Sequence, residues 1–188
     1  MSKKLLTAAL AAFFFMGCST QPPANPNNLC SVFQDKDSWY VAAHKVHAKY
    51  GIPIDTAIAI LAQNSKLSNQ DNGLFESLTS AVGLGNEGFL VVSDEIWQQY
   101  KDEAGNFLSD RGSFADALDF MGWYMNKAKE KSGIALFDAY NQYLVYREGF
   151  DAFNTRSYTA KVWLLNEASE VRNRALEYRK QLLRCNLY

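Results

Sequence analysis

The sequence carries almost no net charge and has no long apolar segment. Its 20 acidic and 19 basic residues nearly cancel, so there is no electrostatic basis for binding nucleic acid or another polyanion. The apolar run at residues 5–16 contains about a dozen residues. That is too few for a helix that crosses a bilayer core of roughly 30 Å. The remaining length suits one domain with its own core.

Residues for metal or cofactor chemistry are also scarce. His44 and His47 are the two histidines of the chain. They suffice for a zinc site only if carboxylates complete it, and no Ser-His-Asp or Cys-His arrangement is in sight. The string GLGNEG at residues 83–88 has the spacing G-x-G-x-x-G. However, neither the strand before it nor the helix within it that a dinucleotide site requires is visible. We therefore expect no metal ion and no cofactor.

The first 17 residues have the features of a secretory signal peptide. Lys3 and Lys4 precede the apolar run, and Gly17-Cys18 ends it ahead of the polar string STQPPANPNN. A small residue directly before a Cys at this point resembles a bacterial lipobox. An ordinary signal peptide with an incidental Cys is the alternative.

The lipobox resemblance implies cleavage before Cys18 and attachment of acyl chains that hold the protein on a membrane. Ser19 in the next position resembles the pattern for sorting to the outer membrane, facing the periplasm. Residues 18–29 then form the lipidated Cys and a flexible tether, and residues 30–188 form the domain.

Two cysteines remain for the domain if Cys18 carries lipid. Cys30 stands at its start and Cys185 near its end. The oxidising setting of an exported protein favours a disulfide between them, and two buried free thiols are the alternative. Closing so long a loop stabilises a fold by roughly 5 kcal/mol in the chain-entropy model.

Apolar spacing predicts one mainly α-helical domain. The helix that begins near Pro53 is apolar on all faces, which indicates burial. Residues 66–93 form an irregular, glycine-containing loop in which FLVV at 89–92 is a candidate strand. The other expected helices span about 37–50, 94–103, 113–131, 135–148 and 156–184, with Ser113 as an N-cap and Gly122 interrupting an apolar stripe.

Asn64 continues the inward stripe of that buried helix, three residues after Leu61 and seven after Ala57. A buried amide without a partner costs about 1–3 kcal/mol. Asn64 or Ser65 either ends the helix or belongs to a functional site.

Three strings, in this order, resemble the lytic transglycosylase (SLT-type, lysozyme-like) domain. They are YGIPIDTAIAILAQNSKL at 50–67, DFMGWYMNKA at 119–128 and AYNQYLVYREG at 139–149. The first is similar to the family's helix that leads into Glu-Ser, and the third keeps Tyr146 and Gly149 of a Tyr-Asn-Ala-Gly pattern. The resemblance runs from about residue 25 to 185. It implies a lysozyme-like fold directed at peptidoglycan glycan strands.

In that family one Glu protonates the glycosidic oxygen and then acts as a base. Asn64 stands in its place and has no titrating proton. Loss of general acid catalysis alone costs roughly 100- to 10,000-fold in rate. The family also has a Gly followed closely by a Gln in the cleft. Here Gly88 with Val91, or Gly83 with Asn86, takes those places, and either register loses the Gln.

The resemblance implies a glycan-binding set: Gln63, Asn64, Ser65, Gly88, Tyr146 and Glu148. Glu148 is the preferred substitute acid, and a solvent-facing Glu near a helix end is the alternative. Glu76, followed by Ser77, lacks the preceding apolar helix. Trp97, Trp123 and Tyr146 suit either sugar stacking or a helical core.

Three functions fit these residues. The first, which we favour, is an outer-membrane lipoprotein with a catalytically degenerate SLT-like domain that binds peptidoglycan or an envelope partner. The second is an active but atypical lytic transglycosylase that uses Glu148. The third is an envelope interaction protein that no longer binds glycan. Because the expected catalytic Glu is missing, the sequence argues against an enzyme more than for one.

Overall fold

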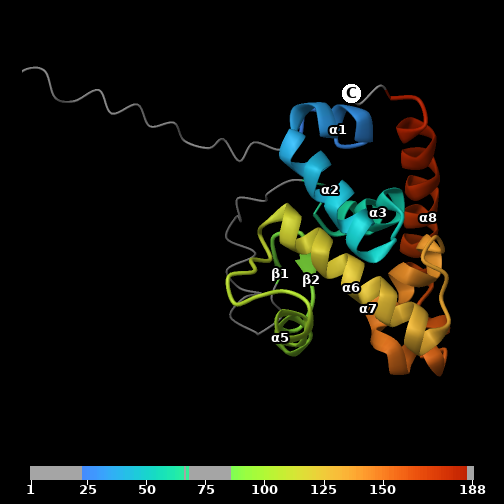
Figure 1. Cartoon of the computed structure of the whole chain (residues 1–188). Coiled ribbons are helices and arrows are strands. Elements are labelled where there is room, and N and C mark those ends of the chain that lie inside the picture. Colours follow the sequence, from blue (N-terminus) through green and yellow to red (C-terminus); the bar gives the residue numbers. More distant parts are fainter. Residues whose placement is uncertain (1–22, 66, 68–85, 186–188) are drawn as a thin grey trace, which may run out of the picture.

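Helices dominate the computed structural model, as the apolar spacing predicts (Figure 1). The structure describes residues 23–65, 67 and 86–185. The elements in chain order are α1 (Leu29–Asp35), α2 (Asp37–Tyr50), α3 (Ile54–Ser65), β1 (Asn86–Glu87), β2 (Leu90–Val91), α5 (Asp94–Glu103), α6 (Phe114–Ser132), α7 (Ala139–Asn154), the 3₁₀ turn η1 (Ser157–Ala160) and α8 (Val162–Leu182). The predicted signal peptide, Cys18 and Glu76 lie outside the described residues. Among the described helices, none has the length and apolar composition needed to cross a bilayer.

Helix α3 forms the centre of the core, as its uniformly apolar sequence predicts. Every residue from Asp55 to Ala62 is buried. Helix α8 runs alongside α3, and helices α6 and α7 pack against other sides of α3 (Figure 1). The buried carboxylate of Asp55 accepts a hydrogen bond from Arg179 Nε on α8 at 2.6 Å. The helix begins one residue later than predicted, because the carbonyl of Pro53 accepts from Ala57 N–H and Pro53 itself lies before the first turn.

The helix bounds differ from the predictions mainly in the C-terminal third. Helix α7 begins at Ala139, where the Asp138 side chain accepts from Asn141 N–H, and it continues to Asn154. Gly149 breaks its regular geometry with φ 80° and ψ 169°. The predicted helix over 156–184 starts only at Val162, because Arg156 adopts φ 59° and the 3₁₀ turn follows. Ser113 caps α6 as predicted, by accepting from Asp116 N–H.

The string FLVV lies in a short hairpin. Leu90–Val91 (β2) pairs antiparallel with Asn86–Glu87 (β1), which confirms the predicted strand in part. Gly88 forms the turn at φ +76°, and a Cβ there would lie 2.6 Å from the Cα of Gly112. The hairpin therefore needs glycine at this position, both for its backbone angle and for this approach.

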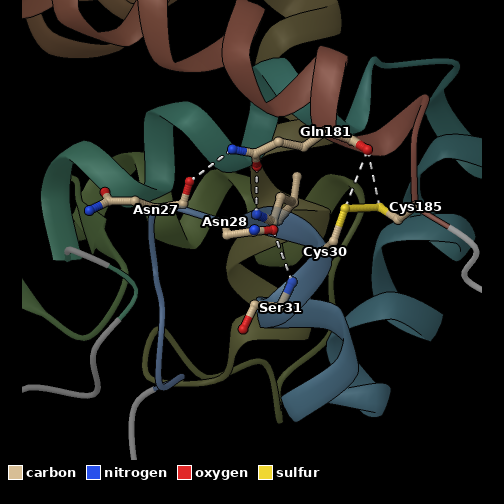
Figure 2. The surroundings of a disulfide bond; sticks show 7 residues. Asn27, Asn28, Cys30, Ser31, Gln181 and Cys185 are labelled. Carbon is tan, nitrogen blue, oxygen red and sulfur yellow. Dashed lines mark hydrogen bonds between the residues drawn. A yellow bond between two sulfur atoms is a disulfide. The ribbon is translucent and has the colours of Figure 1, made fainter.

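Cys30 and Cys185 form a disulfide that joins α1 to the end of α8 (Figure 2). Both sulfur atoms lie 3.3 Å from the carbonyl oxygen of Gln181. These are contacts and not hydrogen bonds, because disulfide sulfurs carry no hydrogen. The Gln181 side chain adds two hydrogen bonds around the start of α1, by accepting from Leu29 N–H and donating to Asn27 O. The two ends of the domain are thus fastened together by covalent and polar contacts.

Candidate functional site

Asn64 and Tyr146, which belong to two separate motif strings, meet in the structure. Asn64 lies at the end of α3, and its Nδ2 donates a hydrogen bond to the Tyr146 hydroxyl at 3.2 Å. The same hydroxyl accepts from the backbone N–H of Val91 on β2 at 2.8 Å. Three elements that are distant in sequence therefore converge on one buried oxygen atom.

Ser65, and not Asn64, provides the hydrogen bonds that end α3. The Ser65 hydroxyl donates to Leu61 O at 3.0 Å and accepts from Leu67 N–H at 3.2 Å. Leu67 then takes a left-handed conformation with φ 53°. The side-chain amide of Asn64 is not used in this termination, which removes the helix-ending role as an explanation for Asn64.

The amide oxygen of Asn64 is buried, and no described group donates a hydrogen bond to it. A buried polar atom in that condition costs about 1–3 kcal/mol. Native proteins keep few such atoms, and those that persist call for a specific explanation such as a binding site. A ligand hydroxyl or amide would supply the missing donor.

Tyr146 is a poor source of protons. Its side chain is only 5% exposed, and burial raises its pKa to about 12, although the hydrogen bond from Val91 N–H acts in the opposite direction. The phenol therefore stays protonated at neutral pH and does not release its proton there. It is suited to orienting groups by hydrogen bonding.

A cavity of about 570 Å³ lies against Tyr146. Its walls come from β2, the start of α5, two residues of α6, and the segment of α7 around the break at Gly149. Glu148 lines it with a side chain that is 9% exposed, and both carboxylate oxygens accept from Lys161 Nζ, at 2.9 and 2.7 Å. Glu148 is therefore a wall residue of the cavity, held in an ion pair.

The remaining predicted site residues take no part in the contact between Asn64 and Tyr146. Gln63 points to α8, where its Nε2 donates to Glu170 Oε2 at 3.2 Å. Gly88 lies in the hairpin turn, against the backbone at Gly112. Trp97 and Trp123 are buried in an aromatic cluster with Tyr100 and Phe120, so both belong to the core and not to a sugar-stacking surface.

Several cavity residues were missed by the sequence analysis. Phe150 stacks on Tyr124 with ring centroids 5.1 Å apart, and Lys131 and Arg147 contribute cations to the wall. The string DFMGWYMNKA contains Tyr124. The predicted helix ends at residue 148, directly before the break at Gly149, but its spacing gives no sign that α7 continues to Asn154. Because the helix is broken at Gly149, the direction of the residues after it could not be predicted from a continuous helical pattern.

No metal site is apparent in the part of the chain that the structure describes. No group of three His, Cys, Asp or Glu side chains comes together among these residues. His47 Nδ1 lies 2.7 Å from Ile52 O, and the His44 ring packs on Tyr40. Both histidines thus have local structural contacts.

The family is decided by comparison with known protein families. The model of the transglycosylase SLT domain matches residues 6–185, nearly the whole chain. The chain belongs to the transglycosylase SLT domain family. Searches of curated proteins and of solved structures each returned no match. The SLT domain is directed at peptidoglycan in the cell envelope.

Membership of the SLT family allows the contact between Asn64 and Tyr146 to be compared with the motifs of that family. The resemblance of the motif strings predicts Asn64 at the place of the catalytic Glu and Tyr146 at the start of the Tyr-Asn-Ala-Gly pattern. These two positions are joined by a hydrogen bond. Val91, which one register of that prediction puts at the place of the family's Gln, donates its backbone N–H to the same hydroxyl.

Proposed function

We propose that this SLT domain binds the glycan strands of peptidoglycan without cutting them. In the same proposal the protein is an outer-membrane lipoprotein, anchored through Cys18 and facing the periplasm. The observation that carries the proposal is the contact between the Asn64 amide and the Tyr146 hydroxyl. It supports the register in which a carboxamide occupies the place of the family's acid.

Cleavage of a glycosidic bond needs a group that gives a proton to the bridging oxygen. The carboxamide of Asn64 has no proton to give at neutral pH, and Tyr146, with a pKa of about 12, holds its proton too firmly. Both groups are able to orient sugar hydroxyls and acetamido groups by hydrogen bonding. This pair therefore suits recognition of a sugar and not its protonation.

Glu148 supports a second candidate, an atypical lytic transglycosylase. Its side chain is nearly buried and lines the same cavity as Tyr146. However, Lys161 engages both carboxylate oxygens, and Glu148 would have to leave that ion pair before it reached a sugar. We therefore favour the binding protein over the enzyme.

The test uses purified residues 19–188, which omit the predicted signal peptide and the lipidated Cys, mixed with peptidoglycan sacculi. The protein is expected to sediment with the sacculi and to release no anhydro-muropeptides. Release of anhydro-muropeptides would overturn the non-cutting proposal, and its loss in Glu148→Gln would identify the acid. A protein that stays wholly in the supernatant would overturn glycan binding and favour an envelope protein as the partner.

A further inference from the structure

Two pairs of a cation and an aromatic ring border the cavity beside Tyr146. Lys131 Nζ lies 4.8 Å from the centroid of the Phe150 ring, and both residues line the cavity. Arg147 also lines the cavity, and its guanidinium carbon lies 6.0 Å from the centroid of the Trp163 ring. Trp163 is 51% exposed, so this second pair lies at the surface of the molecule.

The cations of these pairs have no carboxylate partner among the described residues, which distinguishes them from Lys161 and Arg179. Lys161 takes up the charge of Glu148, the nearly buried acid of the wall. The other acidic side chain that lines the cavity is the exposed Asp151. Two unpaired cations thus stand against one unpaired carboxylate, and the wall has a surplus of positive charge.

An aromatic ring attracts a cation through its electron-rich face and leaves the N–H donors of that cation free. Phe150 and Trp163 therefore help to hold Lys131 and Arg147 in place without using their hydrogen-bonding groups. A guanidinium or ammonium with free donors pairs best with a carboxylate. N-acetylglucosamine units offer no such group, and the lactyl carboxyl of each muramic acid is tied up in the amide bond to its stem peptide. The stem peptides themselves carry several carboxylates.

We propose that Lys131 and Arg147 make this cavity select peptidoglycan whose stem peptides are still attached, by pairing with the carboxylates of those peptides. The inference rests on the proposed binding of glycan strands and names the part of the ligand that the charged wall recognises. The sugars are held beside Asn64 and Tyr146, and the peptide lies along the wall between Phe150 and Trp163.

The experiment compares two probes on residues 19–188 by isothermal titration calorimetry. One is a peptidoglycan tetrasaccharide that carries its stem peptides, and the other is chitotetraose, a tetrasaccharide of N-acetylglucosamine that has no carboxylate. The wild type is expected to bind the peptide-bearing probe about tenfold more tightly, the effect of two partly exposed ion pairs. Raising the salt concentration should reduce this preference, because exposed charges are screened.

The variant Lys131→Gln with Arg147→Gln is expected to bind both probes equally. It should keep the wild-type affinity for chitotetraose, which also shows that it is folded. The matched control is Lys129→Gln with Arg172→Gln, which removes the same charge from exposed residues outside the cavity. In this control Arg172 also belongs to a cation–aromatic pair, with Tyr140 at 5.8 Å. The control is expected to keep the tenfold preference.

A wild type that binds the two tetrasaccharides equally would overturn this inference and leave the proposed function standing. The inference is overturned in the same way if the control loses the preference as fully as the cavity variant. A protein that binds neither tetrasaccharide and does not sediment with sacculi would instead overturn the proposed function itself. Sedimentation with sacculi but no binding of either tetrasaccharide would overturn the selectivity assigned to this cavity.

Discussion

The ring of Tyr50 lies directly against Gly122, so that a Cβ at residue 122 would be 2.3 Å from Tyr50 Cδ2. This contact brings α2 and α6 together. The hydroxyl of the same tyrosine donates to Asp119 at 3.1 Å, which limits how far the ring can move. The glycine that interrupts the apolar stripe of α6 is therefore explained by close packing, and its poor helix propensity is the accompanying cost.

Gly122→Ala is expected to destabilise the domain by about 1–2 kcal/mol. Forcing a methyl group into a contact as short as 2.3 Å costs about 2–3 kcal/mol, the upper part of the usual range, and the better helix propensity of Ala offsets about 1 kcal/mol of it. Urea unfolding measures the change. Gly112→Ala is the control, because a Cβ there meets its nearest neighbour at an ordinary 3.5 Å. A Gly122→Ala protein as stable as the wild type would show that the Tyr50 ring moves aside freely.

The helical architecture could be predicted because it depends on spacing and on local capping groups. The predicted α5 and the cap at Ser113 agree with the structure, since a buried helix face and a capping hydroxyl leave direct marks in the sequence. The short helix α1 was missed. It spans only seven residues and depends on Asn28 as its cap and on a disulfide to a residue at the other end of the domain.

The site could be predicted only at residues that either depart from a recognisable pattern or keep their place in one. Asn64 was found because it departs from the Glu-Ser pattern of the first string. Tyr146 was found because it matches the Tyr of the Tyr-Asn-Ala-Gly pattern in the third string. The cavity wall was missed, because it combines Lys131 at the end of α6 with Arg147 on α7 and with Phe150, which follows the break at Gly149. Contacts between helices of this kind have no signature in the spacing of either helix.

Removal of the disulfide is expected to destabilise the domain by about 2–5 kcal/mol. The bond between Cys30 and Cys185 spans 155 positions, and a long closed loop restricts the unfolded chain strongly. The measurement is urea unfolding of the wild type with and without a reducing agent. The double variant Cys30→Ser with Cys185→Ser is expected to have the same free energy of unfolding as the reduced wild type. Its stability should not change when the reducing agent is added. Equal stability of the oxidised and reduced wild type would contradict the prediction.

Cys18→Ala in the full-length chain is expected to move the protein from the membrane fraction to the soluble periplasmic extract. The reason is that the acyl chains attached to residue 18 supply the proposed membrane anchor, at about 0.8 kcal/mol per buried methylene. Fractionation followed by immunoblotting measures the distribution, and metabolic labelling with a radioactive fatty acid reports the lipid itself. An unlabelled wild type, or a variant that stays in the membrane fraction, would refute lipidation at this residue as the anchor.

Tyr146→Phe is expected to lower the free energy of unfolding by about 1–3 kcal/mol at neutral pH. The substitution removes the acceptor of the Val91 N–H and of the Asn64 amide and leaves both donors unpaired in a buried place. Urea unfolding at pH 7–9 measures this difference, which should be constant over that range. A variant as stable as the wild type would mean that both donors find other partners.

The same pair of proteins tests the raised pKa of Tyr146. A tyrosine in the unfolded chain loses its proton near pH 10, whereas burial holds this one until about pH 12. Between these values the unfolded state binds fewer protons, so the free energy of unfolding of the wild type falls by about 1.4 kcal/mol per pH unit through this residue. The Tyr146→Phe variant lacks this fall in the free energy of unfolding. The other buried tyrosines contribute the same pH dependence to both proteins. The two stability curves should therefore converge between pH 10 and 12, and a gap that stays constant to pH 12 would show that Tyr146 titrates as it does in the unfolded chain.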